Sequence, residues 1–429
     1  MNNTASGNIG ILVGGGPAPG INGVIAAVTI EARKKGINVY GINDGYKWLV
    51  SGDSDLLKKN IRELHIKDVS RIHFDGGSIL YTSRTNPKNI KNGPQNCVKL
   101  LQELGIKYMV TIGGDDTAYG ASLIAKAAEG KIRFAHVPKT IDNDLPLPHN
   151  IPTFGFQTAR EYGSILVKNL MEDSKTTHRW YIAVTMGRHS GHLALGVAKS
   201  AAATLVIIPE EFENEEVISL SHVCDILETS VIKRMAMGHD FGVMVIAEGI
   251  AERLDPQELK KLPGLKFEYD EYGHMRLDEV ELGKVVKYEV ERRFRKRGNK
   301  KFRIVELNIG YVLRSADPIP FDLEYTRDLG YNAFRYLMSK KPEHQKNAMI
   351  IVDNGVLRPL SFDEMMDLKT GKTAVRFVNI EGEAYNIARK YMIRLEKRDI
   401  EEKEMLKKMS EIANMSENEF IERFQYLIK

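Results

Sequence analysis

The chain has 429 residues, 43% hydrophobic and 28% charged, with 36 glycines. At roughly 150 residues per domain this length predicts two or three domains, and the composition excludes a collagenous, disordered or membrane-embedded chain. Lys and Arg number 61 against 57 Asp and Glu, a surplus too small to favour nucleic acid or a membrane surface as a partner.

The first half of the chain repeats an order of strand, glycine-rich turn and helix. Residues 8–13 are a short β-branched run, followed by a glycine loop at 14–20 and a helical pattern from about 22 to 35. The same order recurs at 108–128 and at 181–203. This order is typical of parallel strands joined by crossover helices.

Further apolar runs predict strands at 133–137, 205–208 and 242–247. Ligands of parallel α/β sheets bind at the carboxyl ends of the strands, where the glycine-rich turns of this chain lie. We therefore expect the functional residues to lie in these turns.

The pattern weakens between residues 251 and 303, which are rich in charge and include a basic cluster at 292–297. Such a cluster is typical of a solvated helix face or of an insertion between strands, and binding of a phosphate or a partner is the alternative. Beyond it the sequence predicts a helix over 322–340, a strand over 348–352 and amphipathic helices from 384 to 429.

The glycine loop Gly14–Gly20 is similar to two phosphate-binding patterns but matches neither. The lysine of a Walker A loop is missing after Gly20, and Pro19 stands where a dinucleotide fingerprint needs its third glycine. Unobstructed main-chain amides before a helix still favour an anionic group. A plain tight turn is the alternative.

Two acidic loops follow predicted strands. Gly113–Thr117 carries the adjacent carboxylates of Asp115 and Asp116, whose natural partner is a hard dication such as Mg2+ carried by a phosphate ligand. Pro138–Asp144 combines a lysine, a threonine and two carboxylates, the groups needed to move a phosphoryl group to an alcohol. Each loop alone could be ordinary turn chemistry, but their close succession favours a site.

These motifs together resemble the phosphofructokinase family. The resemblance runs from about Ile9 to Gly330 and is carried by six motifs in order. They are Gly15 with Pro19–Gly20, Gly113–Thr117, Thr140–Asp144, Gly155–Ala159, Met186–Arg188, and Gly310–Tyr311 with Arg314.

The resemblance implies a catalytic role for three residues and a metal-binding role for two. Asp142 would deprotonate the sugar 1-hydroxyl, while Thr140 and Arg188 would position and stabilise the transferring phosphoryl group. Asp115 and Asp144 would hold Mg2+.

The resemblance also implies a fructose 6-phosphate site. The matching positions are Met186, Gly187, Glu248, Tyr311 and Arg314. Arg179 matches an arginine that reaches the 6-phosphate across a subunit boundary, so a homodimer or homotetramer with a shared substrate site is expected.

The resemblance implies that Gly15, Asp116, Thr117 and Lys139 bind the phosphoryl donor. Two of these residues, Asp116 and Lys139, indicate which donor is used. ATP-using members of the family generally carry Gly in place of Asp116 and of Lys139, whereas pyrophosphate-using members are similar to this chain at both. An Asp adds bulk and negative charge where a nucleotide phosphate would lie, and a Lys suits a compact, highly charged donor. Pyrophosphate is therefore the expected donor.

The expected fold is α/β, with two phosphofructokinase-like lobes of parallel-type sheets flanked by helices and a helical C-terminal tail. Residues 1–153 and about 316–350 would form the donor lobe, and 154–315 the sugar-phosphate lobe, with a charged insertion at about 251–303. Residues 351–429 would form a mainly helical C-terminal segment.

The expected activity is reversible phosphoryl transfer from pyrophosphate to fructose 6-phosphate, giving fructose 1,6-bisphosphate and phosphate, in glycolysis or gluconeogenesis. An ATP-dependent enzyme is the first alternative, and a catalytically silent regulatory paralogue is a remote one. With two cysteines, no zinc-ligand spacing and no apolar targeting segment, a cytoplasmic location is expected.

Overall fold

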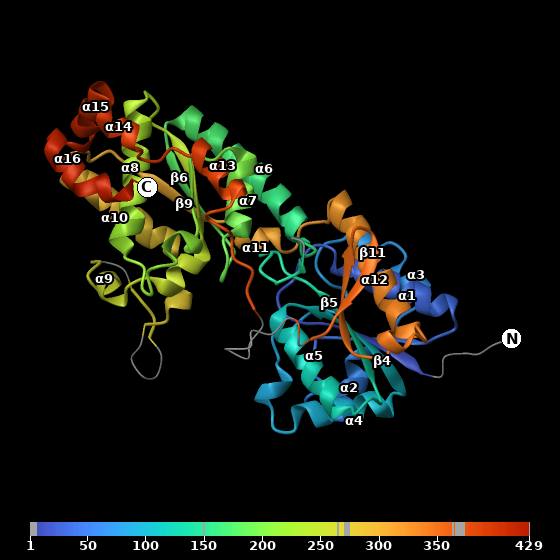
Figure 1. The fold of residues 1–429 in the computed structure, drawn as a ribbon. Coiled ribbons are helices and arrows are strands. Elements are labelled where there is room, and N and C mark those ends of the chain that lie inside the picture. Colours follow the sequence, from blue (N-terminus) through green and yellow to red (C-terminus); the bar gives the residue numbers. More distant parts are fainter. Residues whose placement is uncertain are drawn as a thin grey trace. The chain divides into compact units, whose positions relative to one another are not determined.

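The computed structural model describes residues 7–148, 151–263, 266–269, 275–362, 364 and 374–428. The chain divides into two compact units, each built from two separate stretches. Unit 1 comprises Met1–Ala159 and Val312–Arg376, and unit 2 comprises Arg160–Tyr311 and Phe377–Lys429. Each unit contains its own sheet (Figure 1).

Unit 1 is built on a seven-stranded sheet with the order β11-β10-β5-β4-β1-β2-β3. The strands are β1 (Asn8–Val13), β2 (Val39–Ile42), β3 (Ile61–Glu63), β4 (Ile106–Gly113), β5 (Arg133–Pro138), β10 (Ala348–Asp353) and β11 (Val356–Leu360). The five central strands are parallel, which confirms the predicted sheet type. The edge strands β3 and β11 are antiparallel to their neighbours, an addition that the sequence pattern did not predict.

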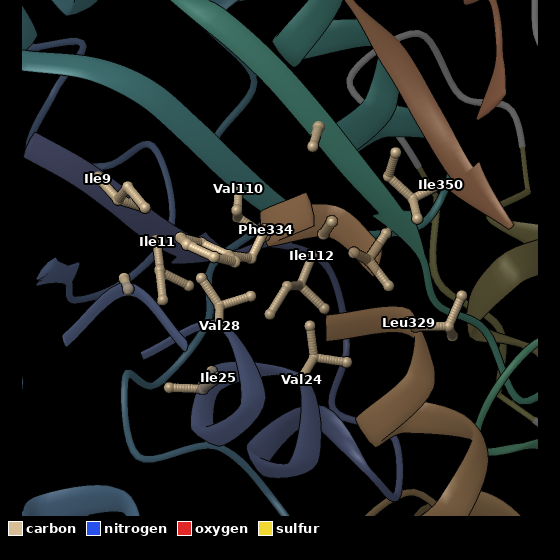
Figure 2. Close-up of a cluster of buried hydrophobic side chains, with 14 of the residues drawn as sticks. Ile9, Ile11, Val24, Ile25, Val28, Val110, Ile112, Leu329, Phe334 and Ile350 are labelled. Carbon is tan, nitrogen blue, oxygen red and sulfur yellow. The ribbon is translucent and has the colours of Figure 1, made fainter. Parts of the chain in front are cut away.

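Helices cover both faces of the unit 1 sheet. They are α1 (Ile21–Lys34), α2 (Ser54–Lys59), α3 (Ile66–Val69), α4 (Gly93–Glu103), α5 (Asp115–Ala127) and α12 (Pro320–Met338). Figure 2 shows Ile9 and Ile11 of β1 facing Val28 of α1 and Phe334 of α12. Leu12 points to the opposite face, into the core beneath α4 and α5, because successive side chains of a strand alternate between faces.

Unit 2 is built on a four-stranded, fully parallel sheet with the order β7-β8-β6-β9. The strands are β6 (Trp180–Thr185), β7 (Leu205–Ile207), β8 (Gly242–Ala247) and β9 (Ile304–Asn308). The helices are α7 (His192–Ala201), α8 (Leu220–Ala236), α9 (Pro256–Lys260) and α10 (Leu282–Lys296). The points along the chain at which one unit ends and the other begins fall within α6 (Phe156–Thr177) and α11 (Gly310–Leu313). The strand β9 follows the charged region and was not predicted.

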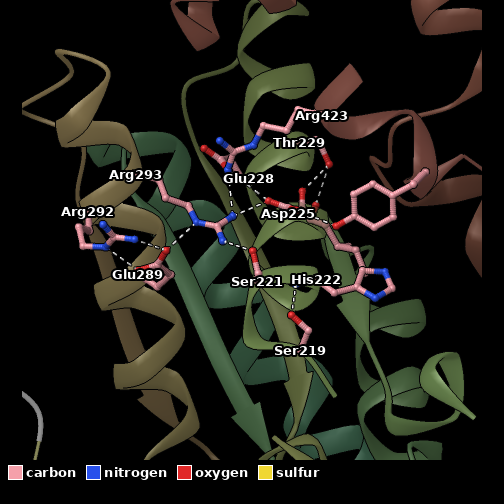
Figure 3. Close-up of polar contacts among 12 residues, drawn as sticks. Ser219, Ser221, His222, Asp225, Glu228, Thr229, Glu289, Arg292, Arg293 and Arg423 are labelled. Carbon is pink, nitrogen blue, oxygen red and sulfur yellow. Dashed lines mark hydrogen bonds and ion pairs between the residues drawn. The ribbon is translucent and has the colours of Figure 1, made fainter. Parts of the chain in front are cut away.

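The interpretation of the basic cluster as a solvated helix face was wrong for Arg293. This residue lies in α10 and is only 8% exposed. Its guanidinium lies 2.5 Å from Asp225 Oδ1, 3.1 Å from Glu228 Oε2 and 2.8 Å from Glu289 Oε1 (Figure 3). The partners Asp225 and Glu228 belong to α8, so this arginine joins two helices.

The C-terminal residues form the predicted helices, which pack on unit 2. They are α13 (Glu383–Tyr391), α14 (Lys397–Glu401), α15 (Lys403–Ala413) and α16 (Glu417–Phe424). Buried ion pairs hold them, with Lys233 Nζ 2.7 Å from Asp399 Oδ2 and Arg394 Nη1 2.6 Å from Glu211 Oε2. Across the described ranges, no helix is both long enough and apolar enough to cross a membrane.

Candidate active site

The glycine loop after β1 is shaped by close approaches within unit 1. Gly15 has a φ of 81°, in the left-handed region, and its amide donates to Ser83 O at 2.9 Å. A Cβ on Gly16 would lie 2.8 Å from Arg314 Nη1. The left-handed backbone therefore favours glycine at position 15, and the Arg314 guanidinium lies against the loop at Gly16.

Thr117 fills the space between two glycine turns. A Cβ on Gly14 or on Gly113 would overlap the Thr117 side chain, which leaves Thr117 only 4% exposed. The Tyr46 hydroxyl donates to Thr117 O at 2.9 Å. Thr117, expected to bind the donor, thus packs the ends of β1 and β4 together.

Asp115 and Asp116 are the first two residues of α5, and both are exposed. Partial desolvation of its carboxyl group and the neighbouring charge of Asp115 raise the pKa of Asp116, whereas Arg84 and a hydrogen bond with Asn86 oppose the rise. Carboxylates are stabilised at a helix N-terminus, where free amides and the helix dipole favour negative charge. The predicted acidic turn is therefore a helix start with Arg84 beside it.

Lys139 links the end of β5 to the glycine loop. Its side chain is 5% exposed, and Nζ donates to Gly16 O. Burial lowers the pKa of Lys139 to about 8; the charge of Arg314 adds to this effect, and Asp142, Asp115 and Asp144 oppose it. The structure thus places the expected base Asp142 and the expected metal ligands Asp115 and Asp144 close enough to act on one ammonium group.

The loop after β5 is ordered by its own polar groups. Asp142 N donates to Thr140 Oγ1 at 3.0 Å, and Thr153 Oγ1 donates to Thr140 O at 2.7 Å. Asn143, between Asp142 and Asp144, has a φ of 57°. Asn tolerates this left-handed conformation better than most residues, which explains an amide residue between the two carboxylates.

Asp115 and Asp144 were expected to hold a metal ion. No group of three or more His, Cys, Asp and Glu side chains suited to a metal is found among the residues that the structure describes. Magnesium is commonly held by one or two carboxylates together with substrate phosphates. The carboxylates of Asp115 and Asp144 both raise the pKa of Lys139 and therefore lie near the same ammonium group. This pair fits the protein part of such a magnesium site.

Three loops meet at the carboxyl edge of the unit 2 sheet. A Cβ on Gly249 would overlap Arg188 O, and one on Gly310 would lie 2.5 Å from Met186 Cγ. Gly187 has a φ of 133°, and its carbonyl accepts from Gly249 N at 3.1 Å. The turns after β6, β8 and β9 therefore pack backbone against backbone.

These turns carry the expected sugar-phosphate residues of unit 2. Glu248 directly follows β8, and Tyr311 is 66% exposed. Arg188, which was expected to be catalytic, forms an ion pair with Glu252 in the same region. Arg314, expected with this group, lies in unit 1 beside Gly16.

Arg179 lies at the opposite edge of the same sheet. It precedes β6, whereas Arg188 follows it. A strand rises about 3.3 Å per residue, so roughly 20 Å separates the two ends. Arg179 is exposed there. It therefore lies apart from the sugar-phosphate residues of unit 2, which are at the carboxyl edge of the sheet.

Sequence reasoning missed several residues of these loops. Arg84 and Asn86 act on Asp116, and Glu252 pairs with Arg188. The run Thr82–Asn86 is polar and contains an arginine, which was the available signal. Nothing local to it indicates that Ser83 lies beside Gly15.

A parallel α/β sheet whose carboxyl edge carries a glycine loop, a buried lysine and paired carboxylates fits a protein that transfers phosphoryl groups between small molecules. The family model for phosphofructokinase matches residues 8–337. The chain belongs to the phosphofructokinase family.

Similar proteins cover almost the whole chain. A Thermotoga maritima protein named pyrophosphate–fructose 6-phosphate 1-phosphotransferase is 54% identical, with 97% of each chain covered. A Naegleria fowleri protein of the same name is 48% identical over 98% of this chain and 96% of its own. The crystal structure of a pyrophosphate-dependent phosphofructokinase from Nitrosospira multiformis matches with a TM-score of 0.65 at 17% identity, over 90% of this chain and 91% of that one, which confirms the fold.

Proposed function

We propose that this chain is a pyrophosphate-dependent phosphofructokinase. It transfers a phosphoryl group from pyrophosphate to the 1-hydroxyl of fructose 6-phosphate, giving fructose 1,6-bisphosphate and phosphate. The names of the two relatives at 54% and 48% identity support this activity. We also propose that the enzyme acts in glycolysis or gluconeogenesis and is located in the cytoplasm.

The donor proposal depends most on Lys139. Its ammonium donates to the glycine loop at Gly16 O, where main-chain amides favour an anion. A buried cation there suits a compact donor with several negative charges, and Asp116 at the start of α5 disfavours a bulkier anionic donor. Gly15 shapes the loop, and Thr117 packs it against β4.

The base in this proposal is Asp142. One of its carboxylate oxygens takes the proton of the sugar 1-hydroxyl as the hydroxyl oxygen bonds to phosphorus. The bridging P–O bond of pyrophosphate breaks, and inorganic phosphate leaves with its electron pair. Thr140, whose Oγ1 also accepts from Asp142 N, positions and stabilises the transferring phosphoryl group together with Arg188.

Mg2+ would neutralise charge on the donor phosphates when bound. Asp115 and Asp144 are the residues that would hold it, since their oxygens match its hard-ligand preference. Their negative charges also act on Lys139, which supports their being close to the donor loop.

The sugar phosphate is assigned to Met186, Gly187, Glu248, Tyr311 and Arg314. Arg179 is proposed to reach the 6-phosphate of a neighbouring subunit in a homodimer or homotetramer. Its location at the opposite sheet edge from Arg188 supports a contribution to another chain rather than to its own.

Initial rates with fructose 6-phosphate and Mg2+, measured separately with pyrophosphate and with ATP, test the function. Turnover with pyrophosphate should exceed turnover with ATP, and fructose 1,6-bisphosphate with phosphate should regenerate pyrophosphate. A preference for ATP would replace this proposal with the ATP-dependent alternative.

A further inference from the structure

Arg376 is a residue of the C-terminal segment that contacts the loop containing the proposed base. It is the last residue of unit 1, and its contacts described below lie within that unit. It belongs to none of the motifs singled out in the sequence and lies outside residues 8–337, which the family model matches.

Three nitrogens of the Arg376 guanidinium donate to the loop. Nε donates to Asn143 O at 2.9 Å, Nη1 donates to Ile151 O at 2.9 Å, and Nη2 donates to Asn143 Oδ1. The Arg376 main-chain amide adds a fourth contact, to Asp144 O at 2.7 Å. Both the backbone and the side chain of this residue therefore hold Asn143, Asp144 and Ile151.

These contacts converge on Asn143, whose left-handed backbone separates two carboxylates. Asn143 Oδ1 also accepts from Thr153 N at 3.1 Å. Its main-chain oxygen and side-chain oxygen are thus both held, and the direction in which the chain leaves Asp142 toward Asp144 depends on this residue.

We infer that Arg376 is a positioning residue for phosphoryl transfer, acting through Asn143 on Asp142 and Asp144. This role depends on the proposed function of Asp142 as the base. The guanidinium suits it because a rigid planar fork can meet several fixed acceptors at once, which a lysine ammonium on a flexible stem cannot. Small displacements of a catalytic group can cost about 100-fold in rate.

Two substitutions separate geometry from charge. Arg376→Met removes both, whereas Arg376→Lys keeps a positive charge near Asp144 and loses the planar fork. We expect kcat to fall about 10- to 100-fold in both variants, while KM for fructose 6-phosphate changes less than about 2-fold. Millimolar guanidine hydrochloride should restore part of kcat in Arg376→Met.

Arg133→Ala is the matched control. Arg133 belongs to unit 1 and donates to Tyr336 O, His344 O and Gln345 Oε1 at 3.1, 3.1 and 2.8 Å, away from the 140–153 loop. Its loss should lower thermal stability without lowering kcat. Amide hydrogen exchange of peptides covering 140–153 should accelerate in Arg376→Met and not in Arg133→Ala.

The outcomes distinguish this inference from the proposed function. If Asp142→Asn is inactive while both Arg376 variants keep kcat within about 2-fold of the unmodified enzyme, the positioning role is overturned alone. Equal exchange of 140–153 in Arg376→Met and Arg133→Ala would also overturn it. Full turnover in Asp142→Asn would instead overturn the proposed base. Should Arg376→Met fail to fold, Arg376→Lys decides.

Discussion

The ammonium of Lys139 donates to the carbonyl oxygen of Gly16, joining the end of β5 to the loop after β1. These strands are not neighbours, because β4 lies between them. The contact places the buried ammonium where three charged groups affect the pKa of Lys139. They are Asp115 after β4, Asp142 after β5 and Arg314 near the glycine loop. The first two predictions concern this group of residues.

Asp142→Asn should reduce kcat by about 10²- to 10⁴-fold, the usual cost of losing a general base. The amide keeps the size of the side chain, so KM for fructose 6-phosphate should change little. Steady-state rates over a range of fructose 6-phosphate concentrations check both values. Near-normal turnover in a folded variant would remove Asp142 from the mechanism.

The donor preference should follow Asp116 and Lys139. Asp116→Gly should raise ATP turnover relative to pyrophosphate turnover, because it removes bulk and negative charge from the start of α5. Lys139→Gly should mainly impair use of pyrophosphate, and the double variant should favour ATP more than either single change. Specificity constants for both donors in all four proteins measure the effect. An unchanged donor ratio in Asp116→Gly would contradict it.

Acid should destabilise unit 1 through His136, which is buried in β5. Its Nε2 lies 3.0 Å from Gly113 O and its Nδ1 lies 2.9 Å from Thr111 Oγ1. A carbonyl only accepts, so Nε2 carries the proton and Thr111 donates to Nδ1. Burial lowers the pKa of His136 to about 3.

The unfolded chain then binds a proton at pH values where folded His136 does not. The stabilising contribution is complete above pH ~6.5 and is lost as the pH falls toward the folded pKa. Between about pH 7 and about pH 4.5, the free energy of unfolding should fall by about 3 kcal/mol more than in His136→Gln. Urea unfolding at both pH values checks this, and identical pH dependences would refute it.

Arg179 should serve a neighbouring subunit. Arg179→Ala should mainly raise KM for fructose 6-phosphate, by the loss of charge-assisted hydrogen bonds of about 1.5–3 kcal/mol. If the site is shared, hybrids of weakly active Arg179→Ala chains with inactive Asp142→Ala chains should exceed the activity of either parent. Verified hybrids without any gain would argue against a shared site.

Arg293→Met should destabilise unit 2 strongly. The change removes a buried guanidinium that lies 2.5 Å from Asp225 and 3.1 Å from Glu228 on α8, and breaking a buried ion pair typically costs about 3–5 kcal/mol. Glu228 keeps Arg297 as a partner, and Asp225 keeps the Tyr426 hydroxyl. Arg292→Met is the control, because Arg292 is 34% exposed and pairs with Glu289 on its own helix. Chemical unfolding should show a cost below about 1 kcal/mol for the control, and similar losses in both variants would contradict the prediction.

Local patterns were sufficient for the central strands and for the loops that follow them. β1, β5 and β10 match predicted runs of apolar residues, because burial on both faces of a parallel sheet produces continuous apolar segments. The glycine and acidic loops were found for a related reason, since a sharp turn at a strand end restricts which residues can occupy it. The edge strands β3 and β11 are partly exposed and lack that signal.

Contacts between distant residues could not be read from the sequence. Arg376 and Asn143 lie 233 positions apart, and Arg293 and Asp225 lie 68 apart. Neither pair has a local periodicity, so a charged run was interpreted as solvated although folding buries Arg293 against carboxylates of another helix. The residue types of the loops can be recognised in the sequence because a turn constrains neighbouring residues. The distant residues that orient these loops depend on the tertiary packing of the whole chain and cannot be recognised in this way.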